Sequence, residues 1–144
     1  MIGKRGITSN KVEGDKCTPR GRFKLKYVFY RKDRISKVKS KLKFIPIKKN
    51  SGWCDDVRSK FYNKFVILPS KYKAEKLYLK ENKYDLIIVL DYNLNPVRKK
   101  RGSAIFLHVA KKKTTPTLGC VAVSKKDLKI ILSYATKNTF LKVV

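Results

Sequence analysis

Hydrophobic residues in this chain either alternate with polar ones or form short unbroken runs, and both patterns favour β-strands. Residues 23–29 place apolar side chains on alternate positions, mostly between lysines, which is the period of a half-buried strand. Residues 84–92 and 103–110 are nearly continuous apolar runs, typical of fully buried strands. Further strands are expected at residues 42–47, 65–68, 119–123 and 140–144. The pattern therefore predicts a mainly β chain.

Helical spacing is confined to two segments. The apolar positions of residues 125–135 recur with the period of a helix, and Ser124 with Asp127 three positions later forms a capping box at its start. Weaker spacing of the same kind predicts a second, short helix over residues 70–82. The chain has 144 residues, no internal repeat and no linker-like stretch, so we expect one domain over residues 1–144.

The charge is extreme, with a formal net charge of +27 at pH 7. The two ends of the chain are strongly basic and residues 51–95 are nearly neutral. Such a field attracts polyanions, so a basic nucleic-acid-binding module, with Tyr27, Phe29 and Tyr30 as a stacking surface, is the alternative from another functional class. Lysine outnumbers arginine and is scattered along the chain, which codon bias alone also produces.

Metal and membrane classes receive little support. The three cysteines form no C-x-x-C pair and His108 is the sole histidine, so we expect no metal and no cofactor. The longest clean apolar run at mid-chain, residues 86–90, is far shorter than the ~20 residues of a membrane helix. The N-terminal residues lack the apolar stretch of ~7–15 residues of a secretion signal, which keeps a cytoplasmic location open.

Cys120 and His108 are the candidate chemical pair. They lie at the ends of two expected core strands, twelve residues apart, so a short loop returns one beside the other. An imidazole that takes the thiol proton generates the nucleophilic thiolate. Free cysteine is also among the most often buried residues, so the spacing alone leaves an inert core thiol as the alternative.

A wider series of motifs decides between these interpretations. The segment GSAIFLHVA at residues 102–110, followed by PTLGCVAV at 116–123, resembles the catalytic signature of the L,D-transpeptidase (YkuD-like) family: histidine, variable loop, then Ser/Thr-x-Gly-Cys. Other matches, in order along the chain, are EGD at 13–15, TPRGRF at 18–23, GWCDD at 52–56, Tyr62-Asn63 and Tyr84-Asp85. They are similar to a short, single-domain branch of that family.

The resemblance implies a fold and a set of roles. The fold would be a mainly β, sandwich-like domain with the cysteine in a cleft. Cys120 would be the acylated nucleophile and His108 its base. Gly119 and neighbouring main chain would form the turn and the oxyanion site, and Thr117 would match the Ser/Thr of the motif. Asp55, Asp56 and Asn63 are candidates for binding an amine or peptide amide, and Trp53 for lining the cleft; turn formation and core packing are the alternatives for the aspartates and for Trp53.

The implied reaction is acyl transfer on peptidoglycan stem peptides through a cysteine thioester. An amine acceptor gives a cross-link, whereas water gives a trimmed peptide, which is the reaction of an L,D-carboxypeptidase. The partners would be donor and acceptor stem peptides, with no nucleic acid, in the periplasm or cell envelope. Leu118, Ala122 and the short loop between His108 and Cys120 depart from the common pattern and concern the acceptor side and the substrate range.

Overall fold

The computed structural model describes residues 1–36, 38–111 and 115–144. The short loop expected between His108 and Cys120 lies partly outside the described residues. Within the described part of the chain, no helix combines the length and the apolar character needed to cross a membrane.

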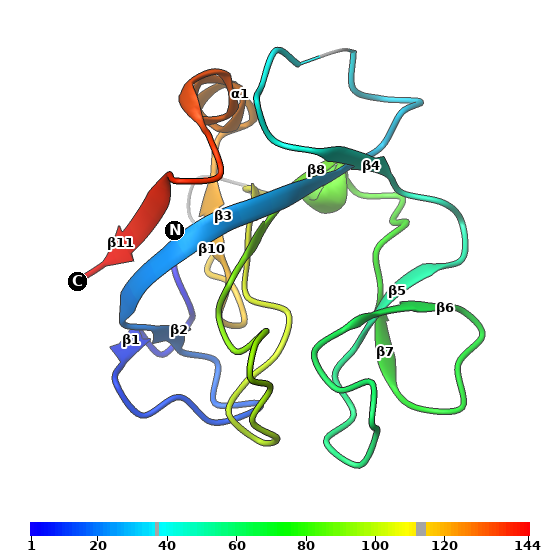
Figure 1. The fold of residues 1–144 in the computed structure, drawn as a ribbon, viewed down its shortest axis with the longest axis vertical. Helices are drawn as coiled ribbons and strands as arrows, with labels where there is room; N and C mark the ends of the chain where they lie inside the picture. The colour runs from blue at the N-terminus through cyan, green and yellow to red at the C-terminus, as the bar shows by residue number, and fades with distance from the viewer. Residues whose placement is uncertain (37, 112–114) are drawn as a thin grey trace.

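A mixed sheet forms the centre of the fold (Figure 1). Its strands run in the order β10-β9-β8-β3-β11, and β4 pairs with β3 as well. Their bounds are Val121–Val123 for β10, Phe106–Val109 for β9, Leu86–Leu90 for β8, Gly21–Tyr30 for β3, Phe140–Val143 for β11 and Phe44–Pro46 for β4. Strands β8 and β9 are buried along their whole length, which confirms the prediction from their continuous apolar runs.

The first part of strand β3 confirms the half-buried strand that its alternation predicts, and the last part, from Val28, departs from it. The pairing with β8 shifts register between Leu25 and Tyr27. A one-residue irregularity turns the following side chains to the opposite face of a sheet. Leu25 therefore belongs to one hydrophobic core and Phe29 to the other. Both faces of the sheet are covered at Val28 and Phe29, whereas Lys24 and Lys26 are exposed. The alternation of the sequence does not reveal this change.

A second, three-stranded sheet has the order β6-β5-β7, with bounds Phe65–Ile67, Ser51–Cys54 and Ala74–Lys76. The short helix predicted over residues 70–82 is wrong, because this segment contains strand β7 and leads into a 3-10 turn, η1, at Asn82–Tyr84. All four residues of β5 are buried, so its backbone groups need partners on both edges. Strand β7 pairs with the second edge of β5, and this pairing outweighs the weak helical spacing of residues 70–82. Strands β1 (Ile7–Thr8) and β2 (Thr18–Pro19) form a separate parallel pair.

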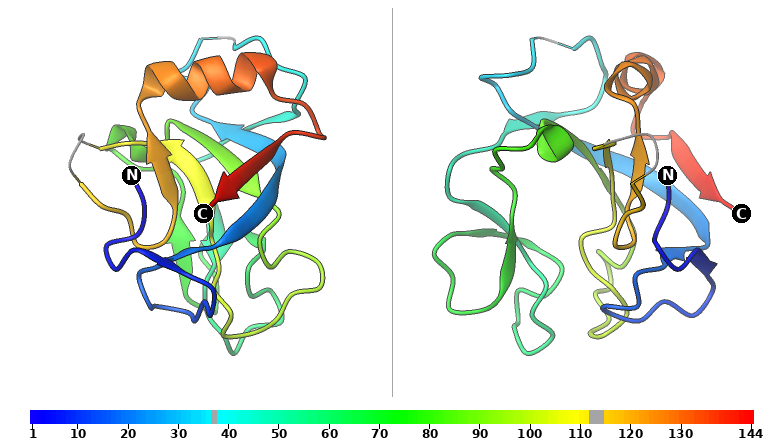
Figure 2. Two further views of the ribbon diagram at one scale, coloured as in Figure 1. Left: turned by 90° about the vertical axis from the view of Figure 1, so that its left-hand side faces the viewer. Right: turned by 180° about the vertical axis from the view of Figure 1, so that it is seen from behind.

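Two cores lie on opposite faces of the central sheet. Ile87 and Val89 of β8 pack towards the small sheet around Trp53, whereas Leu86 and Ile88 pack towards α1, Lys125–Tyr134. Figure 2 shows α1 across one end of the central sheet, away from β5–β7. This arrangement confirms the mainly β, sandwich-like fold with a C-terminal helix.

Ser124 caps the start of α1, and its hydroxyl also donates to the Asp127 carboxylate at 2.6 Å. The backbone N–H of Asp127 donates to Ser124 Oγ at 3.0 Å. Ser124→Ala should therefore lower the free energy of unfolding by about 1 kcal/mol, measured by urea denaturation. Ser133→Ala, on the exposed surface of the same helix, is the matched control and should cost less. Equal losses in the two variants would contradict a role for the cap.

Candidate active site

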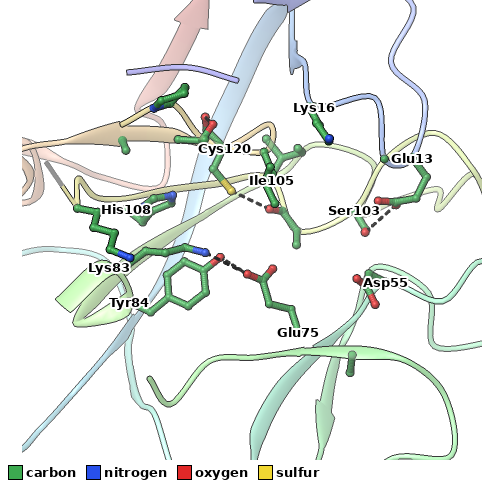
Figure 3. Close-up of a pocket in the computed structure, with 18 of the residues that line it drawn as sticks. Glu13, Lys16, Asp55, Glu75, Lys83, Tyr84, Ser103, Ile105, His108 and Cys120 are labelled. Atoms are coloured by element: carbon green, nitrogen blue, oxygen red, sulfur yellow. Dashed lines mark hydrogen bonds and ion pairs between the residues drawn. The ribbon is translucent and has the colours of Figure 1, made fainter. Parts of the chain in front are cut away.

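A pocket of about 500 Å³ opens where the ends of β9 and β10 face strand β7 of the small sheet. Both predicted catalytic residues, Cys120 and His108, line it, together with Glu75, Tyr84 and several lysines (Figure 3). The pocket therefore lies between the two sheets, on the face of the central sheet opposite α1.

The register of β9 and β10 brings the thiol and the imidazole together. Strand β10 runs parallel to β9 with Ala122 opposite His108. Side chains two positions apart on a strand share a face. Because Cys120 precedes Ala122 by two positions, it lies on the same face as His108. Figure 3 shows both side chains directed into the pocket.

His108 is held as a neutral ring with a defined free nitrogen. Its Nδ1 lies 2.9 Å from the carbonyl oxygen of Val109. A carbonyl can only accept, so Nδ1 carries the proton and Nε2 keeps its lone pair. Burial lowers the pKa of His108 to about 4, because the charged imidazolium loses its hydration there. The imidazole is thus a base at neutral pH.

The Cys120 thiol is protonated and hydrogen-bonded to the backbone of residues 104–106, where strand β9 begins. Its Sγ–H donates to the carbonyl oxygen of Ala104 at 3.0 Å, and Sγ accepts from the N–H of Phe106 at 3.4 Å. Burial first, and then the charge of Glu75, raises the pKa of this thiol to about 12. The resting site therefore pairs a neutral thiol with a neutral imidazole.

Thr117 organises the turn that carries the cysteine. Its Oγ1 donates to the carbonyl oxygen of Cys120 at 2.5 Å and accepts from the N–H of Gly119 at 3.2 Å. The backbone of Thr117 is bonded to the N-terminal segment: its N–H donates to the carbonyl oxygen of Ile2 at 2.9 Å, and its carbonyl oxygen accepts from the N–H of Lys4 at 2.8 Å. The N-terminal segment therefore braces the turn, and the Gly119 N–H is already engaged within it.

Gly119 is required for two separate reasons. Its φ is +137°, and a Cβ there would lie 3.0 Å from the carbonyl oxygen of Cys17. Gly119→Ala should displace the turn and slow alkylation of Cys120 by iodoacetamide at least tenfold, with a loss of about 1–3 kcal/mol of stability.

Gly6→Ala is the control for this change. Gly6 also has a positive φ, +84°, but a Cβ there meets nothing within 4 Å. It carries the backbone strain without the close contact. Unchanged Cys120 reactivity in the Gly119 variant would show that the turn tolerates a side chain.

Trp53 and Asn63 lie in the core behind the pocket and are not among the residues that line it. Trp53 Nε1 donates to Asn63 Oδ1 at 2.9 Å, and the same oxygen accepts from the N–H of Ala104 at 3.0 Å. The Trp53 ring packs edge-on against Phe106 at 5.1 Å between centroids. These two side chains fix the segment whose Ala104 carbonyl accepts the hydrogen bond from the Cys120 thiol.

The two adjacent aspartates have different surroundings. Asp56 is not among the residues that line the pocket and forms a bidentate pair with Arg58, at 2.7 Å and 2.9 Å, which holds its pKa well below the usual range. Asp55 lines the pocket, and its Oδ2 lies 3.2 Å from Lys73 Nζ. Of this pair, only Asp55 is brought to Cys120's pocket.

Both positions that depart from the family motif also line the pocket. Leu118 lies at the tip of the turn and is 76% exposed, and Ala122 lies opposite His108. The aromatic residues considered as a nucleic-acid surface serve a different purpose. Phe29 is buried and stacks on Phe65 at 5.5 Å, and Tyr30 packs on Phe44.

Two pocket residues were not anticipated as parts of the site. Tyr84 was noted as part of a motif but had no role, and its ring stands nearly perpendicular to that of His108, with centroids 5.4 Å apart. Glu75 fell within the wrongly predicted helix. The one signal in the sequence that could have indicated Glu75 is that it is an acidic residue among many lysines.

A family model for the L,D-transpeptidase catalytic domain, YkuD, matches residues 1–144, the whole chain. The chain belongs to this family. No curated protein and no solved structure matches it. The resemblance found in the sequence motifs is confirmed. This family consists of cell-wall enzymes that act on peptidoglycan, and belonging to it associates the chain with the cell envelope.

Proposed function

We propose that this catalytic domain, formed by residues 1–144, is an L,D-transpeptidase that acylates Cys120 with a peptidoglycan stem peptide and transfers the acyl group to an amine. The observation that supports this most is the shared pocket of Cys120 and His108, with the thiol and the imidazole on one sheet face. A third group, the Val109 carbonyl, sets the tautomer of the base.

In the first step, His108 Nε2 takes the proton from Cys120 Sγ as the sulfur attacks the carbonyl carbon of the scissile amide. The C–S bond forms and the carbonyl becomes an oxyanion. Collapse of this intermediate breaks the C–N bond, and His108 returns the proton to the leaving amine, the terminal D-alanine. The product is a thioester on Cys120. In the second step an amine attacks the thioester and releases the thiol.

The electrostatics of the resting pair favour proton transfer only during attack. A thiol with a pKa near 12 beside an imidazole with a pKa near 4 does not ionise spontaneously. Negative charge must therefore pass directly from sulfur to the developing oxyanion. Since the Gly119 N–H is engaged by Thr117, we assign the oxyanion to the N–H of Cys120, which donates to no acceptor among the described residues. One such donor is typically worth about 2.7–4 kcal/mol.

The test is incubation with purified tetrapeptide muropeptides. We expect intact-protein mass spectrometry to show a thioester adduct that peptide mapping places on Cys120. An adduct on another residue, or turnover without any adduct, would contradict the proposal.

The alternative at the same site is an L,D-carboxypeptidase that uses water in the second step. Chromatography of the muropeptide products separates the two activities, because only the transferase makes dimers. Trimmed monomers alone would establish the carboxypeptidase, while leaving the roles of Cys120 and His108 unchanged.

A further inference from the structure

Glu75 presents a carboxylate to the pocket that the thioester chemistry above does not use. It lies in β7, opposite Trp53 of β5, and its side chain points across the gap between the sheets towards the side of the pocket that holds Cys120 (Figure 3). Its charge is felt at the thiol, since it raises the pKa of Cys120 after burial has done so. In the first step this charge opposes formation of the thiolate.

The carboxylate is held firmly through one oxygen. Glu75 Oε1 accepts from the hydroxyl of Tyr84 at 2.5 Å and from Lys83 Nζ at 3.3 Å. Tyr84 is 2% exposed and is wedged against His108 and Phe106. Glu75 Oε2 has no hydrogen-bond partner among residues 1–36, 38–111 and 115–144, although a carboxylate offers both oxygens. About a third of the side chain is exposed, and the side chain is among those that line the pocket.

The second step requires a ligand that such an oxygen attracts. A primary amine is an ammonium ion in neutral water, and the field of a protein with a net charge of +27 repels it. Lys11, Lys16 and Lys73 around the pocket add to this repulsion. The Glu75 carboxylate, of which Lys83 contacts only Oε1, reduces this repulsion locally, whereas neutral water gains nothing from it. A charge that hinders the first step is thus suited to the second.

We propose that Glu75 binds the ammonium group of the acyl acceptor through Oε2 and thereby favours aminolysis of the Cys120 thioester over its hydrolysis. This inference rests on the proposed thioester chemistry. The bound ammonium first loses one proton to solvent. The amine nitrogen then attacks the thioester carbonyl and passes a second proton to His108 Nε2, and the C–N bond forms as the C–S bond breaks. The imidazolium returns that proton to the departing thiolate, so the products are an amide, a neutral thiol and one proton in solvent. Tyr84 is the positioning residue that keeps the carboxylate in place.

The experiment compares two nucleophiles on the acylated enzyme. Ethanolamine is cationic at neutral pH, and hydroxylamine is uncharged there. Glu75→Gln preserves the size of the side chain and the acceptor for Tyr84 but removes the charge. We expect it to raise the KM for ethanolamine about tenfold and to lower the ratio of transfer to hydrolysis equally, with an acylation rate that does not fall and unchanged transfer to hydroxylamine.

Glu81→Gln is the matched control, because it removes an identical charge from an exposed side chain that is not itself among the residues lining the pocket, although its partner Lys111 is. It should leave the ratio unchanged. Glu75→Asp keeps the charge but withdraws it by one methylene, so it should give an intermediate KM for ethanolamine, and it serves as the test if the glutamine variant does not fold.

The possible results separate the two proposals. An unchanged ratio in Glu75→Gln, or equal losses with ethanolamine and hydroxylamine, would overturn the role of Glu75 while acylation of Cys120 still stands. Loss of acylation in this variant would also overturn it, because Glu75 would then serve the thiol. Failure of the wild-type enzyme to form any Cys120 adduct would instead contradict the proposed function.

Discussion

Cys120→Ala should abolish the acyl-enzyme and lower muropeptide turnover by about 10⁴-fold or more, the range found when a catalytic nucleophile is removed. The sulfur is the atom to which the stem peptide is transferred, and within the described residues of the pocket no second thiol is available to replace it. Intact-protein mass spectrometry and product chromatography measure the two losses.

The chain offers a matched control for this variant. Cys17 is also a free, partly exposed thiol, but it is not among the residues that line the pocket. Cys17→Ala should keep full acylation and turnover. Near-normal turnover by Cys120→Ala would exclude nucleophilic catalysis by this residue and with it the thioester mechanism.

His108→Gln should lower kcat/KM about 10²–10⁴-fold, because the thiol then has no base to receive its proton. The effect should depend on pH in a defined way. Since the pKa of His108 is lowered to about 4, the imidazole is a free base above this value and is protonated below it. The wild-type rate should therefore fall with an acid limb near pH 4, well below the 6.5 of an ordinary histidine.

The pH profile of kcat/KM for the wild type and the variant provides the measurement. The variant should lose the acid limb, and its thermal midpoint should show that it folds. An acid limb that persists in His108→Gln would assign the titrating group to another residue. A wild-type limb near pH 6.5 would show that substrate-free His108 is more hydrated than its burial in the fold indicates.

Much of the site was predictable because its features depend on residues that are close together in the sequence. The strands around His108 and Cys120 are unbroken apolar runs, and their faces follow from a period of two. Ser124 and Asp127 specify the start of α1 within four residues. Gly119 belongs to a motif whose spacing suffices to indicate a tight turn. These features depend on neighbours in sequence, so the sequence alone carries them.

Other features depend on partners far away in the chain. The segment over residues 70–82 has weak helical spacing, and it becomes β7 because the buried strand β5 has an edge to be paired. Trp53 and Asn63 were candidates for the cleft, yet they pack behind it and hold Ala104, 41 positions along the chain from Asn63.

The sequence by itself determined the strand-rich architecture, the C-terminal helix and the candidate pair Cys120 and His108, since each rests on local periodicity or on a motif of fixed spacing. Only the tertiary structure decided the chemistry around that pair. It set the tautomer of His108 through Val109, the protonation of the thiol through burial, and the approach of Glu75 from a second sheet. Desolvation and charge coupling depend on which distant segments surround a group, and no local pattern contains that information.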